Sequence, residues 1–258
     1  MSCLLASLVL AVGAGSWQAP QVDRIAPLGG QRGTEVTVEF QGQRLFEPQG
    51  LMLGEPGLEV LEVASDKPER CTVRLQIAED CALGSHPLRL RTAFGIANLT
   101  MFQVGTLPEV VENRVGDAVQ VVPLDCTVNG SLRAEELDRY AVELAAGTLV
   151  QCELQAFRLG AKAIDLAMLV LGPDGGEIAR ADDTVLGIKD PMLSFVASAA
   201  GSYEVRVQTA FTDDQNFGSY RLHLGTFPRP TGCVPCGGQP GEELEVTLLG
   251  MTASAADD

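Results

Sequence analysis

The sequence has little of what most enzymes and nucleic-acid-binding proteins use. It holds two histidines, and its 18 lysines and arginines face 34 aspartates and glutamates, a formal net charge of −16. Nucleic-acid backbones and anionic lipids repel so acidic a chain. It has no G-x-S-x-G, H-E-x-x-H, P-loop or dinucleotide-binding motif. These absences favour a non-catalytic protein without a nucleic-acid partner. Solubility accounts for the acidity, with recruitment of a divalent cation as the alternative.

The two histidines give no support to catalysis. His223 lies on the polar face of an alternating segment, so we expect it to face solvent. His86 lies in a Gly-Ser-His-Pro segment, which we interpret as a turn. We assign no catalytic residue and no cofactor, with calcium as the alternative. A Ser-His-acid site built from distant positions is the remaining enzymatic alternative.

Long hydrophobic runs are also absent. The apolar stretch within Met1–Gly15 is shorter than the roughly 20 residues that a membrane-spanning helix needs. Small residues at Gly13–Ser16 offer a cleavage site, so we predict a signal peptide at 1–19 and a secreted, periplasmic or cell-surface protein without membrane insertion. The segment before the apolar run has no Lys or Arg, and a buried first strand is the alternative.

Apolar and polar residues alternate along most of the chain. This period of two is typical of strands with one face in a core and one in water, as in antiparallel sandwiches. Turn-forming clusters separate the segments: Gly29-Gly30, Asn129-Gly130, Pro173–Gly176, Gly201 and Gly218. Only Arg133–Leu137 has a short helical pattern. The sequence therefore predicts an all-β protein, with alternating segments at 35–41, 72–77, 88–91, 140–144, 150–156, 203–208 and 220–224.

An internal repeat organises the chain. Residues 27–42 recur at 235–250, an offset of 208, with eight of the sixteen positions identical. Both copies place a glycine-rich turn before an alternating strand that ends at glycine. The repeat predicts a first module, a second module, and the truncated beginning of another module of the first type at 229–258.

Each module resembles a known family. Val22–Pro27, Gly33–Val38 and Ala82–Gly95 resemble TIG/IPT-type immunoglobulin-like domains, a resemblance that covers residues 20–106. Residues 107–228 resemble the bacterial pre-peptidase C-terminal domain, through the landmarks Val128–Gly130, Leu137–Tyr140, Asp165–Leu171, Asp182-Asp183, Asp190, Ala200–Tyr203 and Gly218–Leu222. The resemblances imply an immunoglobulin-like sandwich followed by a jelly-roll-like antiparallel sandwich. Arg139 stands where the second family usually has an Asp, which puts a role for that acid in doubt.

The cysteines leave several interpretations open. Removal of the signal peptide would leave six, at 71, 81, 126, 152, 233 and 236. Cys71 and Cys152 share the parity of buried apolar positions, and Cys233 and Cys236 align with Ile25 and Leu28 in the repeat. Buried thiols, bridges Cys71–Cys81 or Cys126–Cys152, and a metal site are the alternatives.

One acidic set is a candidate for ion chemistry. Asp182, Asp183 and Asp190 supply the carboxylate oxygens that Ca²⁺ prefers, and we name them as possible calcium ligands. The alternative is a solvated turn whose aspartates bond their own backbone.

Together these patterns predict a non-catalytic secreted or cell-surface binding or architectural protein whose partner is an extracellular protein or polysaccharide. An accessory region of a secreted peptidase, with its catalytic part outside this chain, is the alternative.

Overall fold

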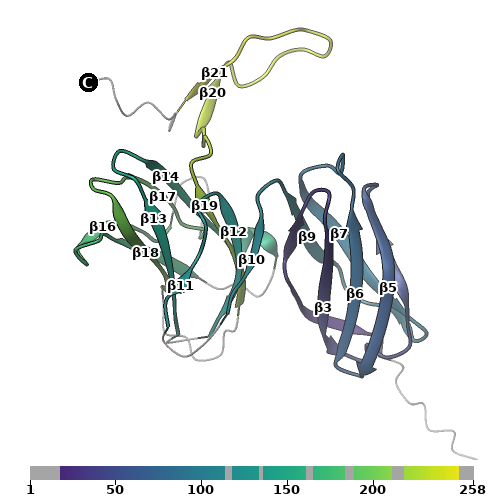
Figure 1. The fold of residues 1–258 in the computed structure, drawn as a ribbon. Coiled ribbons are helices and arrows are strands. Elements are labelled where there is room, and N and C mark those ends of the chain that lie inside the picture. Colours follow the sequence, from purple (N-terminus) through teal and green to yellow (C-terminus); the bar gives the residue numbers. More distant parts are fainter. Residues whose placement is uncertain are drawn as a thin grey trace, which may run out of the picture.

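The structure is a computed structural model and describes residues 18–113, 118–133, 136–160, 165–183, 189–210 and 218–249. Within these ranges every regular element is a β-strand except one turn of 3-10 helix, η1 (Phe157–Leu159) (Figure 1). The prediction of an all-β protein is confirmed. Residues 1–17 of the predicted signal peptide lie outside the described residues, as does the centre of the predicted helical stretch Arg133–Leu137. No helix in the described part is long and apolar enough to cross a membrane.

The first sandwich is built from two facing sheets. One has the strand order β1 (Gln21–Ala26), β3 (Glu35–Gln43), β6 (Arg70–Ile77), β5 (Leu58–Lys67). The other has the order β2 (Gly29–Gln31), β9 (Thr100–Gly105), β7 (Gly84–Thr92), β4 (Pro48–Leu53), with β8 (Gly95–Ile96) also paired to β7. Alternate side chains fill the space between the sheets, among them Val38, Phe40, Val73, Leu75, Leu90 and Phe102.

The second sandwich has two five-stranded sheets. One has the order β10 (Glu109–Val111), β12 (Cys126–Leu132), β19 (Gly218–Gly225), β14 (Leu149–Gln155), β17 (Met192–Val196). The other has the order β11 (Gln120–Val121), β13 (Leu137–Leu144), β18 (Gly201–Thr209), β15 (Leu166–Leu171), β16 (Glu177–Ala181). Its separate core includes Cys126, Val128, Leu154, Met168, Tyr203 and Leu222.

A buried hydroxyl network crosses the core of the second sandwich. The Tyr140 and Tyr220 hydroxyls lie 2.5 Å apart, and the Tyr220 hydroxyl donates to Asp138 at 2.6 Å. Burial raises the pKa of Tyr220 well above its usual value, so the phenol stays protonated and can donate. Asp138, which precedes Arg139 in the sequence, thus has a structural partner in Tyr220.

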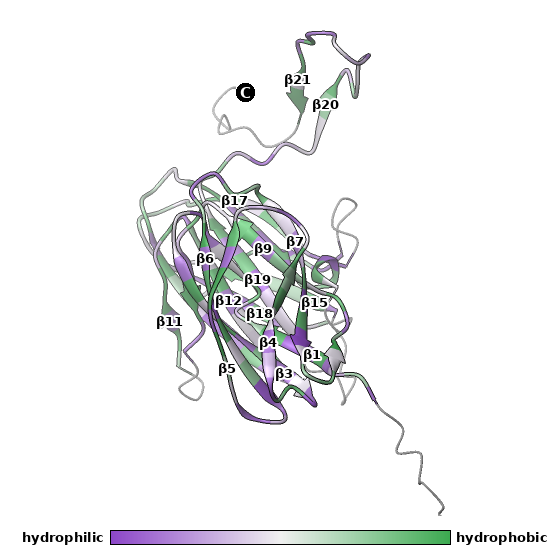
Figure 2. Ribbon diagram, turned by 90° about the vertical axis from the view of Figure 1, so that its right-hand side faces the viewer, coloured by the Kyte–Doolittle hydropathy of each residue, from purple (hydrophilic) through white to green (hydrophobic). Residues whose placement is uncertain are grey.

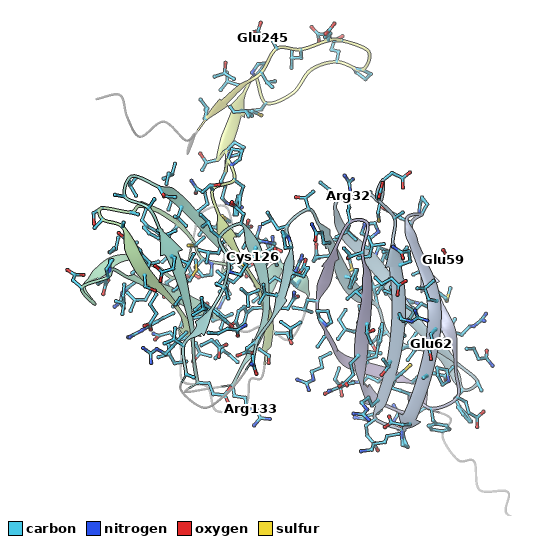
Figure 3. The ribbon with its side chains drawn as sticks, in the orientation of Figure 1. Arg32, Glu59, Glu62, Cys126, Arg133 and Glu245 are labelled. Carbon is cyan, nitrogen blue, oxygen red and sulfur yellow. The ribbon has the colours of Figure 1, made fainter. Side chains whose placement is uncertain are left out.

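A two-stranded hairpin, β20 (Gly232–Val234) and β21 (Thr247–Leu249), follows the second sandwich. It projects away from both sandwiches in two views at right angles (Figures 1 and 2). Burial differs among the labelled side chains: Cys126 lies in the interior of the second sandwich, whereas Glu59 and Glu62 on β5 and Glu245 before β21 are exposed (Figure 3).

Four of the predicted turn positions lie in strands. Gly29-Gly30 lies in β2 and Asn129-Gly130 in β12, and Gly201 and Gly218 are the first residues of β18 and β19. Gly130 is needed for close packing, because a Cβ there would lie 2.3 Å from the ring of Tyr220. The Pro173–Gly176 turn is confirmed: Gly175 has a φ of +78° and its N–H donates to Gly172 at 2.9 Å. A glycine pair marks tight backbone approach as well as a turn, and the sequence does not separate the two.

Candidate functional site between the two sandwiches

The outer face of the β10-β12-β19-β14-β17 sheet carries polar side chains that are not in water. Those with at most 7% exposure are Thr127, Asn129, Gln151, Glu153, Ser219 and Arg221. Part of this face meets the first sandwich, where the Leu28 N–H donates to Asn129 Oδ1 at 3.2 Å. Leu159 of η1 also belongs to the buried cluster of the first sandwich. The two sandwiches are therefore packed against each other and are not merely joined by a linker.

An ion pair lies at the centre of this contact. Arg221 donates to the Glu109 carboxylate, which also accepts from Asn129 Nδ2 at 2.5 Å. Burial raises the pKa of Glu109 and the Arg221 charge opposes that rise. Removal of Glu109 would leave the buried Arg221 charge without its ion-pair partner, which is costly.

Gly29 allows the two sandwiches to approach this closely. A Cβ at this position would lie 2.3 Å from the Gln103 carbonyl oxygen and 2.7 Å from Arg221 Cζ. The Arg221 guanidinium thus packs directly against the β2 backbone. Sequence reasoning missed Arg221 and Glu109, because Arg221 alternates with apolar Tyr220 and Leu222 like any solvent-facing residue.

A second charged network lies further along the same sheet. Glu153 accepts from Arg158 at 2.6 Å and also from Arg229. Burial by itself would raise the pKa of Glu153, but these two guanidinium groups lower it below its usual value. The pKa of Arg158 is raised because its carboxylate partners, Asp190 and Glu153, outweigh the effect of burial.

Asp190 is fully buried within this network. Its carboxylate accepts from the backbone N–H groups of Ala156, Phe157 and Arg158 at 2.7–3.1 Å, and from Arg158 Nε at 2.7 Å. It therefore fixes the η1 turn that carries Leu159.

His223 lies directly opposite Glu153 in the β14–β19 register. Its Nδ1 lies 2.8 Å from Thr127 Oγ1. Burial, followed by the nearby positive charge of Arg221, lowers its pKa to about 4. The expectation that His223 faces solvent is wrong: its strand face is covered by the charged network, and the ring is at least partly buried.

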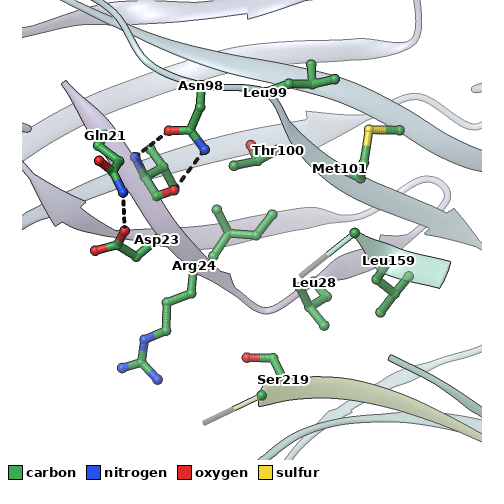
Figure 4. A pocket seen from close by; sticks show the side chains of 14 residues that line it. Gln21, Asp23, Arg24, Leu28, Asn98, Leu99, Thr100, Met101, Leu159 and Ser219 are labelled. Carbon is green, nitrogen blue, oxygen red and sulfur yellow. Dashed lines mark hydrogen bonds between the residues drawn. The ribbon is translucent and has the colours of Figure 1, made fainter. Parts of the chain in front are cut away.

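A groove runs along β1 between the sandwiches. One hollow of about 580 Å³ is lined by β1, by the segment Asn98–Met101 and by Leu159, Gly160, Gly218 and Ser219 (Figure 4). A neighbouring hollow of about 390 Å³ is lined by β1 and by residues of β10 and β12. The two hollows share Arg24, Ile25, Leu28 and Ser219, so they adjoin. Both sandwiches contribute walls.

β1 is the terminal strand of its sheet. Asn98 bonds its edge as the peptide group of a neighbouring strand would: Oδ1 accepts from the Val22 N–H at 2.7 Å, and Nδ2 donates to the Val22 carbonyl at 2.9 Å (Figure 4). The backbone donor and acceptor of Val22 on this edge are therefore satisfied by a peptide-like group of the chain itself.

The acidic residues named as calcium ligands do not gather as one set. Asp182 and Asp183 come together with Asp165, with ligand oxygens within 4.8 Å of one another, whereas Asp190 lies in the η1 network. Lys189 Nζ lies 2.7 Å from Asp165 Oδ2. Burial, and then the charges of Asp183 and Asp165, raise the pKa of Asp182. The calcium assignment of Asp182 and Asp183 stays a prediction.

His86 is a strand residue, and its assignment to a turn is wrong. It lies in β7 with 2% of its surface exposed, and its Nε2 contacts the Ala82 carbonyl at 2.7 Å and Cys81 Sγ at 3.8 Å. The turn that Gly-Ser-His-Pro indicated ends at Gly84, whose φ is +106°. His86 is distant in sequence and in fold from His223.

The cysteines divide into two groups. Cys71, Cys81, Cys126 and Cys152 are buried free thiols, and burial raises the pKa of Cys152 to about 12. Such thiols are poor nucleophiles. Cys233 is half-buried and Cys236 is exposed, contrary to the expectation from the repeat, because no facing sheet covers the hairpin among the described residues.

No family model and no curated protein matches the chain. Similar solved structures include the pre-peptidase C-terminal domain of a collagenase from Bacillus anthracis, with 16% identity over 43% of this chain and 99% of that one, at a TM-score of 0.35. They include PliG of Aeromonas hydrophila, a periplasmic inhibitor of g-type lysozyme, with 15% identity over 43% and 98%, at 0.33. SGBP-B of Bacteroides ovatus, solved with a mixed-linkage heptasaccharide, has 10% identity over 73% and 74%, at 0.27. These values assign neither family nor function.

Proposed function

We propose that this chain is a non-catalytic, exported binding protein that holds an extended protein segment in the groove along β1. The observation that carries the proposal is that the groove has walls from both sandwiches, held together by the buried Arg221–Glu109 pair. A ligand loses less affinity to ordering when its site is already formed.

The chemistry of the groove favours a polypeptide over other ligands. A terminal strand offers backbone donors and acceptors to an added strand, and the bonds of Asn98 to Val22 imitate that pairing. Apolar side chains from Leu28, Leu99, Met101 and Leu159 line the larger hollow, where alternate side chains of such a segment would lie. The pattern at 1–19 supports export.

Two matched substitutions test the site. Leu99 lines the groove and is 50% exposed, whereas Leu83 lies outside it and is 53% exposed. We expect Leu99→Glu to weaken binding of extended peptides from a peptide array by at least about tenfold, which is about 1.4 kcal/mol, and Leu83→Glu to leave it unchanged. Both variants should fold normally, because both leucines are at the surface.

Three results would count against this function. Equal binding by both variants would place the site elsewhere. Binding to a glycan array and not to peptides would replace the protein segment with a polysaccharide. Cleavage of a bound ligand by the purified chain would refute the non-catalytic assignment.

A further inference from the structure

The C-terminal hairpin reproduces the geometry of β1–β3, in addition to its sequence. β1 and β3 pair Arg24 with Gln41, Ile25 with Phe40 and Ala26 with Glu39. With the offset of 208, the equivalent pairs are those observed in β20–β21: Gly232 with Leu249, Cys233 with Leu248 and Val234 with Thr247. The connecting turns also agree, with φ of +73° at Gly33 and +84° at Gly241. The hairpin therefore has the register of a strand pair that belongs in a sandwich.

The face that is buried in the first copy is uncovered in the second. Ile25, Leu28, Val38 and Phe40 are each at most 4% exposed. Their equivalents differ: Cys233 is half-buried, Cys236 is exposed, and Val246 and Leu248 are 46% and 55% exposed. Since the positions are equivalent, the same face has lost its cover.

One backbone edge is open as well. In the first sandwich, β3 pairs with β1 on one side and with β6 on the other, from Glu35–Gln76 to Gln41–Arg70. β21 pairs with β20, and no other strand of the described part of the chain pairs with it. An open edge next to an uncovered apolar face is a site for strand addition.

We propose that β20–β21 is an assembly site for a second sandwich of the first type, completed by polypeptide of the same kind as residues 44–105. This occupant is specified by the repeat: in the first copy those residues supply β6 for the equivalent edge, and Leu75, Ile77 and Phe102 belong to the core that covers the equivalent face. The site is independent of the groove along β1, and either proposal can fail without the other.

A fusion tests the proposal, with Cys233 and Cys236 as built-in reporters. The chain through Met251 is followed by a second copy of residues 44–106, which keeps the offset of 208, and Cys3→Ser removes the one remaining thiol of the N-terminal segment. In the parent, two thiols should react rapidly with a thiol reagent, because the other four described cysteines are buried. In the fusion we expect that number to fall to none. Val73→Asp with Leu75→Asp in the added copy is the control, and it should restore rapid labelling.

A second fusion separates a mismatched core from a wrong assignment. It carries Cys233→Ile, Cys236→Leu and Leu248→Phe, which restore the residues of the first sandwich. Hydrogen exchange then measures whether the backbone amides of the added segment are protected. Protected amides in the added segment of either fusion support the proposal. Rapid labelling in the first fusion together with no added protection in the second would overturn it.

Discussion

Acidification gives the sharpest test of the buried charged sheet face, through His223. The folded protein holds the pKa of this imidazole at about 4, against an ordinary value of 6.5. Glu153, directly opposite, favours the protonated ring, but burial and the guanidinium groups of Arg221, Arg229 and Arg158 outweigh it. The unfolded chain takes up a proton below about pH 6.5 and the folded chain only near pH 4. Stability from the neutral ring is therefore full above pH 6.5 and is lost as the pH falls toward 4.

The magnitude follows from the two pKa values. As the pH falls from 7.5 to 5, the depressed pKa of His223 should lower the free energy of unfolding by about 2 kcal/mol. Urea unfolding followed by circular dichroism at the two pH values measures the loss, and the same experiment on His223→Gln removes this contribution while retaining a partner for Thr127. We expect the variant to lose about 2 kcal/mol less than the parent. Equal losses in the two proteins, within about 0.5 kcal/mol, would refute the assignment of a depressed pKa, and an NMR titration of the ring would give the value directly.

Three further predictions follow from other contacts. Gly29→Ala should lower the free energy of unfolding in urea by about 2–3 kcal/mol, because its Cβ has no room. Gly237→Ala is the control and should lower it by under about 0.5 kcal/mol, because no atom lies within 4 Å of a Cβ there. Similar losses in the two variants would contradict the close approach of the sandwiches. Asp190→Asn should lower the free energy of unfolding by about 2 kcal/mol, because an amide N–H₂ would face donors that now bond a carboxylate oxygen. An unchanged midpoint of urea unfolding would contradict this. Millimolar Ca²⁺ should raise the melting temperature by about two degrees, and Asp182→Asn with Asp183→Asn should abolish the rise; a melting curve insensitive to calcium would leave this acidic cluster without a bound ion.

The strand pattern could be predicted because alternation is a local property. Val36–Phe40 and Val73–Ile77 alternate in the sequence, and each forms one side of a paired ladder in the structure. The repeat also gave the alignment of the hairpin with β1–β3 in advance.

The candidate site could not be predicted, because its residues have no local signal. Arg221 and His223 stand at polar positions of an alternating strand, and alternation says which face a residue is on but not whether a second domain covers that face. Asp190 matched a family landmark, but its four donors come from a turn more than thirty residues earlier. Burial of a polar face is a long-range property.

Leu159 has a consequence for how these two units can be used or inherited. It belongs to a turn of the second sandwich, yet it is packed in the core of the first, and only residues 106–108 separate β9 from β10. A cut at that short connection would leave a hole in one core and strip the cover from Asn129 and Arg221 in the other. The two sandwiches therefore cannot be exchanged between proteins as independent domains. Recombination that keeps both cores intact has to move both sandwiches together.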